Sequence, residues 1–260
     1  MSLRTCASPA IVRGRRERSP RCRNIQGLDT LVLTVASIRR ATPSTRTVRL
    51  SLDGHPFDHV AGQAALIGTA HQPERVPYSI ASSPEDARRN GYLEFLLKLE
   101  PEGWGAHLDG LRHGAAVSVE GPIGTFVFPA APRERQFLFV AGGTGIAPLR
   151  SMIRHAFDVR QAGRLHLLYS ARTPQDFAYL PELRRYARAG RLELAVTATR
   201  DTRRGWRGEQ GRITSDRLAR LIETPDTLCF VCGPASMVDD VPRMLVALGV
   251  ARTRIRLEEW

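Results

Sequence analysis

Residues 137–148 read FLFVAGGTGIAP, and this stretch decides how the second half of the chain folds. Its first five residues are continuously apolar, as expected for a strand of a parallel sheet that is covered on both faces. Three glycines follow and would let backbone N–H groups approach a phosphate without a Cβ in the way. They are Gly142, Gly143 and Gly145. Pro148 suits the first turn of a helix, and a helix N-terminus attracts anions. The stretch therefore predicts a strand, a phosphate-binding loop and a helix.

The segments around this stretch alternate between strand-like and helix-like patterns up to the end of the chain. We expect strands at 136–141, 165–170, 192–198, 227–232 and 254–258, and helices near 148–161, 180–189, 214–222 and 235–248. This alternation is typical of an α/β domain with a mostly parallel sheet. We assign residues 132–260 to that domain.

The preceding part of the chain has short apolar and β-branched runs separated by turn residues. We expect strands at 31–38, 47–52, 64–67, 93–99, 117–119 and 125–128. Short strands at this spacing indicate an antiparallel barrel or sandwich. Residues 129–132, which contain two prolines, predict a linker. The first domain is therefore expected to cover 29–131.

Residues 1–28 form a basic arm with seven arginines and one acidic residue, within a chain of net charge +12. The arm has no apolar periodicity, so a disordered tail is favoured over a nucleic-acid or membrane contact, and we do not expect nucleic acid as a partner. Its composition also has some features of an organellar transit peptide. Since no apolar stretch reaches the length of a membrane helix and no secretory signal is evident, we expect a cytoplasmic protein without a membrane span.

Other chemistries find little support in the sequence. There is no nucleophile elbow, no Walker loop and no zinc-protease motif. The pair Cys229 and Cys232 has no second pair or histidine at zinc spacing, and its apolar surroundings favour a buried strand. We expect no metal site. No cysteine-rich iron–sulfur run accompanies the two domains, so electrons would have to leave to a separate acceptor.

Four segments, taken in order, resemble the ferredoxin-NADP reductase superfamily, and most closely its bacterial ferredoxin/flavodoxin-NADP reductases and oxygenase reductase components. They are Arg75-Val76-Pro77-Tyr78-Ser79, the glycine-rich stretch, Cys232-Gly233-Pro234 with Met237, and the ending Glu258-Glu259-Trp260. The resemblance covers about residues 30–260. It implies an antiparallel six-stranded flavin-binding barrel followed by a parallel-sheet NAD(P)-binding domain. It also implies FAD as the bound cofactor.

The resemblance gives each residue of the first segment a role toward flavin. Arg75 would lie near the flavin phosphates, the Tyr78 ring against the isoalloxazine and the Ser79 hydroxyl near flavin N5, roles that suit a guanidinium, an aromatic ring and a hydroxyl. The family's next phosphate-binding segment carries a serine where this chain has Gly105. Backbone donors would have to replace the missing hydroxyl. They would come from Gly103, Gly105, Ala106 and His107.

Arginines mark the expected NADPH site. The strand after the glycine-rich stretch ends in Ser170 and Arg172 rather than in an acidic residue, which favours a ribose 2′-phosphate over a free 2′-hydroxyl. By the resemblance, Arg172, Arg200 and Arg212 would hold that phosphate. Some relatives that use NADH keep the first and the last, so Arg200 is the discriminating residue. We expect NADPH, with NADH as the open alternative.

The same resemblance places the nicotinamide beside Thr144 and Cys232, with Gly233, Pro234 and Met237 next to them. Cys232 would orient the ring for hydride transfer, although a small buried thiol is also ordinary core packing. Glu258 would relay protons or bind the nicotinamide amide. Trp260 would shield the flavin or stack on its adenine. An exposed chain end is the competing interpretation.

These expectations combine into one hypothesis: an FAD-dependent oxidoreductase that passes hydride from NAD(P)H to FAD and then electrons to an external acceptor. The acceptor would be an acidic ferredoxin, flavodoxin or oxygenase component, because the chain is basic. The alternatives are an NADH-dependent oxygenase reductase, a free-flavin reductase and a nucleotide-binding module without catalytic activity.

Overall fold

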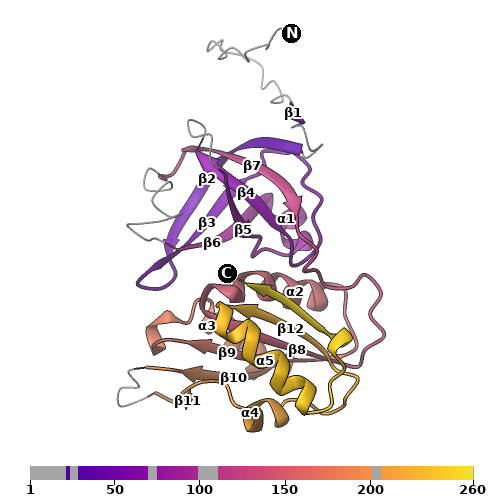
Figure 1. Cartoon of the computed structure of the whole chain (residues 1–260). Coiled ribbons are helices and arrows are strands. Elements are labelled where there is room, and N and C mark those ends of the chain that lie inside the picture. The colour runs from indigo at the N-terminus through magenta and orange to yellow at the C-terminus, as the bar shows by residue number, and fades with distance from the viewer. Residues whose placement is uncertain (1–21, 24–28, 70–74, 99–110, 201–205, 260) are drawn as a thin grey trace, which may run out of the picture.

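The computed structural model describes residues 22–23, 29–69, 75–98, 111–200 and 206–259. Two sheets, each with its own core, lie one above the other, and the segment 124–135 joins them (Figure 1). The predicted boundary between residues 131 and 132 falls within that segment and stays a prediction. Of the predicted N-terminal arm, the structure describes only Cys22–Arg23, which forms β1 and pairs with the next strand.

The first sheet is an antiparallel barrel, as predicted. Its strands are β2 (Asp29–Arg40), β3 (Thr45–Ser51), β4 (Ala64–Thr69), β5 (Val76–Ser79), β6 (Tyr92–Lys98) and β7 (Ala116–Ile123). They pair antiparallel in the order β5-β4-β7-β2-β3-β6. A single bridge between Ile80 and Phe95 joins the two ends of this order and closes the barrel. Alternate residues such as Leu31, Leu33 and Val35 point inward and are buried, which is the period-2 pattern of a strand with one face on a core.

The second sheet is entirely parallel. Its strands are β8 (Gln136–Gly142), β9 (Arg164–Ala171), β10 (Glu193–Ala198), β11 (Glu209–Gln210), β12 (Leu228–Gly233) and β13 (Ile255–Glu259). Their order is β11-β10-β9-β8-β12-β13. Every residue of β8 is buried, because helices cover both faces of the sheet. The predicted α/β domain is confirmed.

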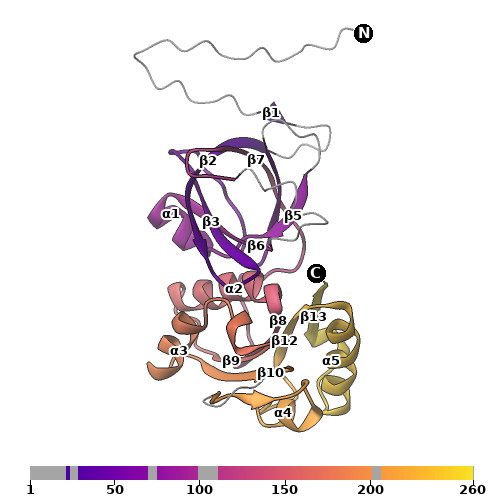
Figure 2. The ribbon, with the colours of Figure 1, turned by 90° about the vertical axis from the view of Figure 1, so that its left-hand side faces the viewer.

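Four helices cover this sheet in two layers (Figure 2). On one face lie α2 (Ile146–Asp158) and α3 (Leu180–Arg188), whose Leu149 and Leu183 join a core with Phe139. On the other face lie α4 (Ser215–Ala219) and α5 (Ala235–Ala247), whose Leu218 and Val241 join a second core. None of the helices in the described ranges is long and apolar enough to cross a membrane.

The expected strand at 125–128 is wrong. These residues are irregular, and Phe126 and Phe128 pack against Phe230 of β12 instead of completing the barrel. The barrel's sixth strand is β5, a short segment containing Pro77 that the sequence pattern did not mark as a strand. A helix that was not expected, α1 (Pro84–Asn90), follows it and begins with a capping box between Ser83 and Asp86.

Candidate functional site

A cleft of about 620 Å³ opens at the carboxyl ends of the parallel strands, between the second sheet and the barrel. This is the edge at which α/β sheets bind ligands. Many residues that the sequence singled out line the cleft together. They are Gly142, Gly143, Thr144, Arg172, Arg200, Arg212, Pro234 and Met237.

The glycine-rich loop has the backbone freedom that a phosphate cradle requires. Gly143 has φ of +55°, and a Cβ built there would meet no atom within 4 Å, so its backbone faces open space. Gly145 is the opposite case, because a Cβ there would fall on the carbonyl oxygen of Cys232. A Cβ on Gly142 would lie 2.8 Å from Met237 Cε and Pro234 Cδ. Gly143 is therefore open for a ligand, while Gly142 and Gly145 allow close packing.

A hydrogen bond from β9 also holds the glycine-rich loop in place. Tyr169 of β9 is fully buried and donates a hydrogen bond of 3.1 Å to the carbonyl oxygen of Gly143. The loop forms one 3₁₀ turn, Gly143–Gly145, and passes directly into α2, whose first turn contains Pro148 as predicted. The N–H of Ile146 donates to the carbonyl oxygens of Gly143 and Thr144 in that turn, and no side chain caps the helix, so the positive end of its dipole stays open to an anion. Thr144 is half-buried at the cleft wall.

The three predicted arginines come from three different loops and meet in the cleft. All of them are exposed, and none forms an ion pair with another residue in the described part of the chain. The backbone N–H of Arg200 donates to the carbonyl oxygen of Arg172 at 2.7 Å, which joins two of the loops. Arg217 donates to the carbonyl oxygens of Arg212 and Gln210 and so supports the third. This convergence gives the cleft a positive wall that suits a phosphate.

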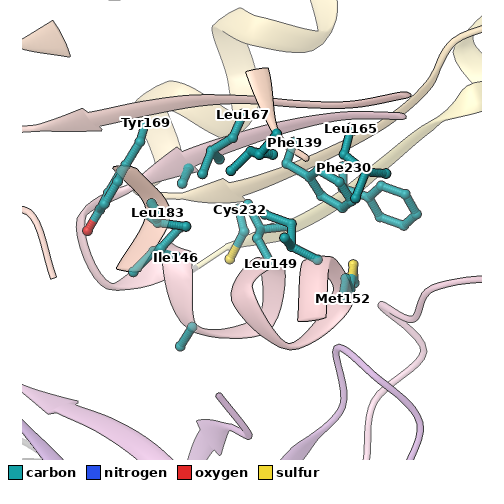
Figure 3. Packing of buried hydrophobic residues seen from close by; sticks show 14 of the residues in the cluster. Phe139, Ile146, Leu149, Met152, Leu165, Leu167, Tyr169, Leu183, Phe230 and Cys232 are labelled. Atoms are coloured by element: carbon teal, nitrogen blue, oxygen red, sulfur yellow. The ribbon is translucent and has the colours of Figure 1, made fainter. Parts of the chain in front are cut away.

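Cys232 and Glu258 form a pair beside the loop rather than in the cleft lining. They are direct neighbours on the parallel strands β12 and β13, with Cys232 Sγ 3.9 Å from Glu258 Oε2. The Cys232 thiol is fully buried and points toward α2 (Figure 3). Gly233 follows it, and a Cβ built on Gly233 would lie 2.8 Å from Met237 Sδ. Cys229 lies deeper in the same strand, and burial raises the pKa of its thiol to about 12, so it stays protonated and inert.

The predicted flavin segment lies on the barrel. Arg75 precedes β5, and within that strand the Tyr78 ring is half-buried and the Ser79 hydroxyl buried. The small residues Ala65 and Ala64 stand opposite them on β4. These three side chains are not part of the cleft lining. The remaining predicted residues lie outside the described ranges. They are Gly103, Gly105, Ala106, His107 and Trp260.

Both donor sets fit the two cofactors that the sequence suggested. The cleft combines an open glycine backbone, a helix N-terminus without a side-chain cap and three guanidinium groups, which match a dinucleotide with an additional phosphate. The β5 segment combines a guanidinium, an aromatic ring and a hydroxyl, which match the phosphates, the flat ring and a ring nitrogen of a flavin.

Sequence reasoning missed the barrel's share of the cleft. The barrel side of the cleft is lined by Thr42 and Ser44 from the β2–β3 turn, Thr45 at the start of β3 and Lys98 at the end of β6. The Thr42 and Thr45 hydroxyls are buried and lie 2.7 Å apart. No motif marks these residues. Only the fold brings a turn of the first sheet to the edge of the second.

A polar cluster at the opposite edge of the sheet has the residue types of a metal site. The ligand atoms of His166, Glu193 and Glu223 lie within 4.8 Å of one another. However, Glu223 is already paired with Arg164 at 2.8 Å, and the two carboxylates approach opposite nitrogens of the imidazole ring. The contacts among these side chains account for the cluster, and we assign no ligand to it.

Two family models match the chain. An oxidoreductase FAD-binding domain matches residues 32–128, and an oxidoreductase NAD-binding domain matches residues 139–243. The matches cover most of the barrel and most of the parallel sheet, respectively.

Known proteins agree with these models. A Ralstonia protein, the ferredoxin–NAD(P)⁺ reductase component of naphthalene 1,2-dioxygenase/salicylate 5-hydroxylase systems, is 30% identical over 87% of this chain and 68% of its own length. Ferredoxin–NADP reductase B of Sorangium cellulosum is 30% identical over 87% of this chain and 96% of its own. A solved ferredoxin reductase in carbazole 1,9a-dioxygenase superposes with a TM-score of 0.77 and 28% identity, covering 91% of this chain and 70% of that one.

Proposed function

The chain belongs to the ferredoxin-NADP reductase superfamily, and from this premise we propose that it prefers NADPH and delivers electrons to an acidic ferredoxin, flavodoxin or oxygenase component. Its general activity follows from the family: it is an FAD-dependent oxidoreductase that takes electrons from NAD(P)H and passes them to an external acceptor. Residues 29–131 would bind FAD, and residues 132–260 would bind the nicotinamide coenzyme.

The cleft carries the argument for NADPH. Arg172, Arg200 and Arg212 would bind the ribose 2′-phosphate, because three cations without carboxylate partners among the described residues converge there. The open backbone at Gly143 and the N-terminus of α2 would bind the pyrophosphate. The buried Thr42 and Thr45 hydroxyls offer further hydrogen bonds from the barrel side.

Residues between the barrel and the parallel sheet would orient the flavin and nicotinamide rings. Bound FAD supplies the chemistry of accepting two electrons as hydride and releasing them singly. Arg75 would bind its phosphates, Tyr78 would stack on its ring, and Ser79 would donate a hydrogen bond to it. Cys232 would pack against the nicotinamide, and Glu258 would hold or move a proton beside the thiol that it contacts.

The acceptor is proposed from charge and from what the relatives are. The chain carries a net charge of +12, and complementary charge raises the rate at which a partner is encountered. The similar Ralstonia protein is the reductase component of oxygenase systems. A small acidic electron-transfer protein therefore fits this chain, although the relatives differ in which acceptor they serve.

The activity is tested by one spectroscopic experiment. Purified protein should show flavin absorbance, and anaerobic NADPH should bleach it. Protein that is colourless, takes up no FAD and leaves added FAD oxidised in the presence of NADPH would overturn the cofactor assignment.

The coenzyme preference is tested by Arg200→Ala, with Arg164→Ala as the matched exposed control outside the cleft. We expect the KM for NADPH to rise by about 10-fold to 100-fold, since a hydrogen bond to a charged group contributes about 1.5–3 kcal/mol. Turnover with NADH should change little. If wild-type protein prefers NADH, the alternative of an NADH-dependent oxygenase reductase is favoured. If the NADPH preference survives the substitution, Arg200 is not the residue that sets it.

A further inference from the structure

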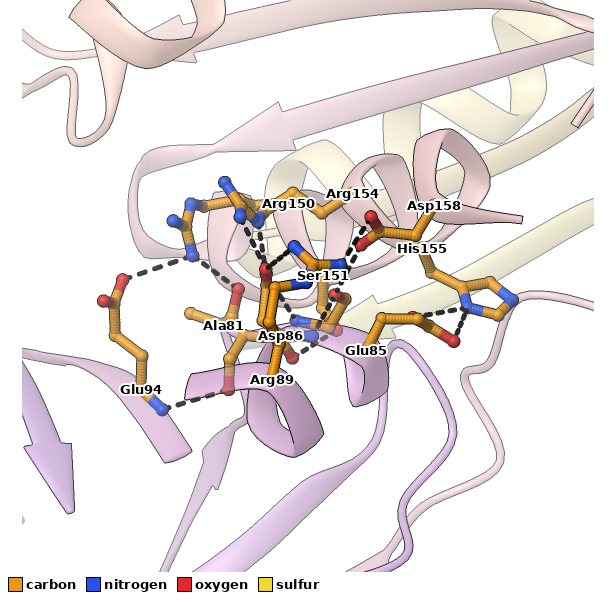
Figure 4. Close-up of polar contacts among 12 residues, drawn as sticks. Ala81, Glu85, Asp86, Arg89, Glu94, Arg150, Ser151, Arg154, His155 and Asp158 are labelled. Carbon is orange, nitrogen blue, oxygen red and sulfur yellow. Dashed lines mark hydrogen bonds and ion pairs between the residues drawn. The ribbon is translucent and has the colours of Figure 1, made fainter. Parts of the chain in front are cut away.

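The two sheets are joined by a cluster of charged and polar side chains that the proposed chemistry does not use (Figure 4). We call it the α2 junction, and it consists of Ala81, Ser82, Asp86, Glu94, Arg150, Ser151, Arg154, Tyr179 and Glu182. Its contacts between the two sheets centre on α2, the helix that begins at the glycine-rich loop.

Arg150 is the centre of the α2 junction. Its side chain is only 8% exposed, and Nη1 donates to the carbonyl oxygen of Ala81 at 2.7 Å. The same nitrogen lies 3.2 Å from Glu94 Oε1 of β6. On its other side, Nε and Nη2 both donate to Glu182 Oε2 of α3, at 3.0 and 2.9 Å. One guanidinium therefore bonds to the barrel and to the second sheet's helices at once.

The barrel side of this contact leads directly to the proposed flavin strand. Ala81 is two residues after Ser79, and its N–H donates to the carbonyl oxygen of Glu94 at 2.7 Å. Ser151 adds a second bond, since its hydroxyl donates to the carbonyl oxygen of Ser82 at 2.8 Å. The chain that leaves β5 is thus held by two consecutive residues of α2.

The other side of Arg150 contacts Tyr179, which adjoins the wall of the proposed coenzyme cleft. Arg150 lies over the ring of Tyr179 at 4.3 Å from its centroid. Tyr179 has φ of +60°, which is uncommon for a residue other than glycine, and it directly follows Ala178 of the cleft wall. A bonded path therefore runs from the wall of the cleft through Tyr179 and Arg150 to the end of β5.

From this geometry we propose that Arg150 is a positioning residue for hydride transfer: it fixes the flavin strand relative to the glycine-rich loop and the cleft. It touches neither proposed cofactor site. Its effect is on the alignment of the two rings, and the rate of hydride transfer is sensitive to displacements of about 1 Å. This inference rests on the proposed function, because it needs the two cofactors at the two sites.

Arg154 distinguishes positioning from mere attachment. It pairs with Asp86 of α1 and with Glu182, so it also joins the sheets, but it bonds to a helix side chain and not to the backbone that follows β5. Loss of Arg154 should weaken the junction, whereas loss of Arg150 should shift the strand itself.

The test compares Arg150→Met, Arg150→Lys and Ser151→Ala with the control Arg254→Met. Arg254 also bonds two acidic residues and a carbonyl group, at Glu134 and Asp226, but it joins segments next to the second sheet only. Anaerobic stopped-flow reduction by NADPH gives the limiting rate of flavin reduction and the dissociation constant of NADPH separately. NADPH deuterated at the transferred position gives the isotope effect on the hydride step.

We expect Arg150→Met to retain FAD and to lower the limiting rate by about 10-fold to 100-fold, with a larger isotope effect and a nearly unchanged dissociation constant. Arg150→Lys should recover part of the rate, because an ammonium keeps the charge but cannot reach all acceptors of the planar guanidinium. Arg254→Met should lower the melting temperature without lowering the limiting rate.

A wild-type limiting rate in flavin-loaded Arg150→Met would overturn the proposal, as would an equal loss in Arg254→Met. If Arg150→Met does not fold, Arg150→Lys decides, because it keeps the charge but cannot reach all acceptors of the guanidinium: a wild-type limiting rate in both Arg150→Lys and Ser151→Ala would reject the positioning role. Failure of the proposed function is recognised separately, since wild-type protein would then bind no flavin or would not be reduced by NADPH.

Discussion

Two groups of arginines in this molecule share a residue type and differ in every other respect. The junction arginines, Arg150 and Arg154, are largely buried and bond to Asp86, Glu94 and Glu182. The cleft arginines are exposed and form no ion pair with another described residue. They are Arg172, Arg200 and Arg212.

The difference separates arginines that hold the fold together from arginines that we propose to bind a ligand. A guanidinium that is removed from water needs partners, and α1, β6 and α3 provide them at the junction. The cleft arginines form no ion pair with a described residue, although Asp176 and Asp240 line the same cleft, because those carboxylates bond to Thr173 and Arg243 instead. An anionic ligand can therefore pair with them without first breaking an internal contact.

The largest expected effect tests the structural group. Asp86→Asn keeps the size of the side chain but removes the charge that pairs with Arg154, and we expect the free energy of unfolding to fall by about 3 kcal/mol. Urea denaturation followed by circular dichroism measures it. The control is Asp226→Asn. The Asp226 carboxylate pairs with Arg254 but is 81% exposed, so this substitution should change the free energy of unfolding by less than about 0.5 kcal/mol. Equal losses in the two variants would remove the distinction between the groups.

A smaller effect tests the ligand-binding group. At about 100 times its dissociation constant, 2′,5′-ADP should stabilise the wild-type protein by about 2.7 kcal/mol. In Arg212→Ala, a 10-fold weaker affinity would reduce this to about 1.4 kcal/mol at the same concentration. Thermal unfolding with and without the ligand measures both. Without ligand, Arg212→Ala should unfold like the wild type, and a clear loss of stability would assign Arg212 to the structural group.

The smallest expected effect is a loss of stability at low pH. Burial would raise the pKa of Asp86, but hydrogen bonds from Arg154 and Ser83 outweigh it and hold that pKa below its ordinary value. Burial acts likewise on Glu182, and the charges of Arg150 and Arg154 hold its pKa down as well. Both carboxyls therefore add stability above their unfolded values of about 3.9 and 4.3, and this stability is lost as the pH falls below that range.

Urea titrations at pH 7, 5, 4 and 3 check this direction. We expect the wild-type protein to lose stability below about pH 4.3, and Asp86→Asn to lose less over the same interval because one titrating group is gone. Arg212→Ala should follow the wild-type curve. A wild-type stability that is flat down to pH 3 would contradict the depressed pKa values.

The sequence predicted those parts of the fold that depend on local pattern. The apolar run before Gly142 and the alternation after it identified the parallel sheet, because a strand buried on both faces leaves an unmistakable composition. The short strand β5 and the irregular segment around Phe126 were not predicted correctly, because Pro77 obscures a strand and Phe126 is buried by the second sheet rather than the first.

The site was predictable to a similar degree. The glycines and the cleft arginines could be proposed from motifs, but in a chain with 38 basic residues nothing local distinguishes Arg200 from Arg150. Partners far along the chain make that distinction: Glu94 and Glu182 reach Arg150 from opposite sides. Thr42 and Lys98 entered the cleft for the same reason, since only the packing of the two sheets brings them there.

The contact of Gly145 with the Cys232 carbonyl group limits how this protein could be redesigned. A variant library that seeks a new coenzyme preference should keep glycine at position 145. Any larger residue there would push α2 away from β12 and change how the two sheets are aligned. Positions 172, 200 and 212 are the ones to randomise, since their side chains are exposed and form no ion pair with another described residue. Directed evolution of coenzyme preference can therefore vary the cleft arginines, but it has to keep the glycine beside β12.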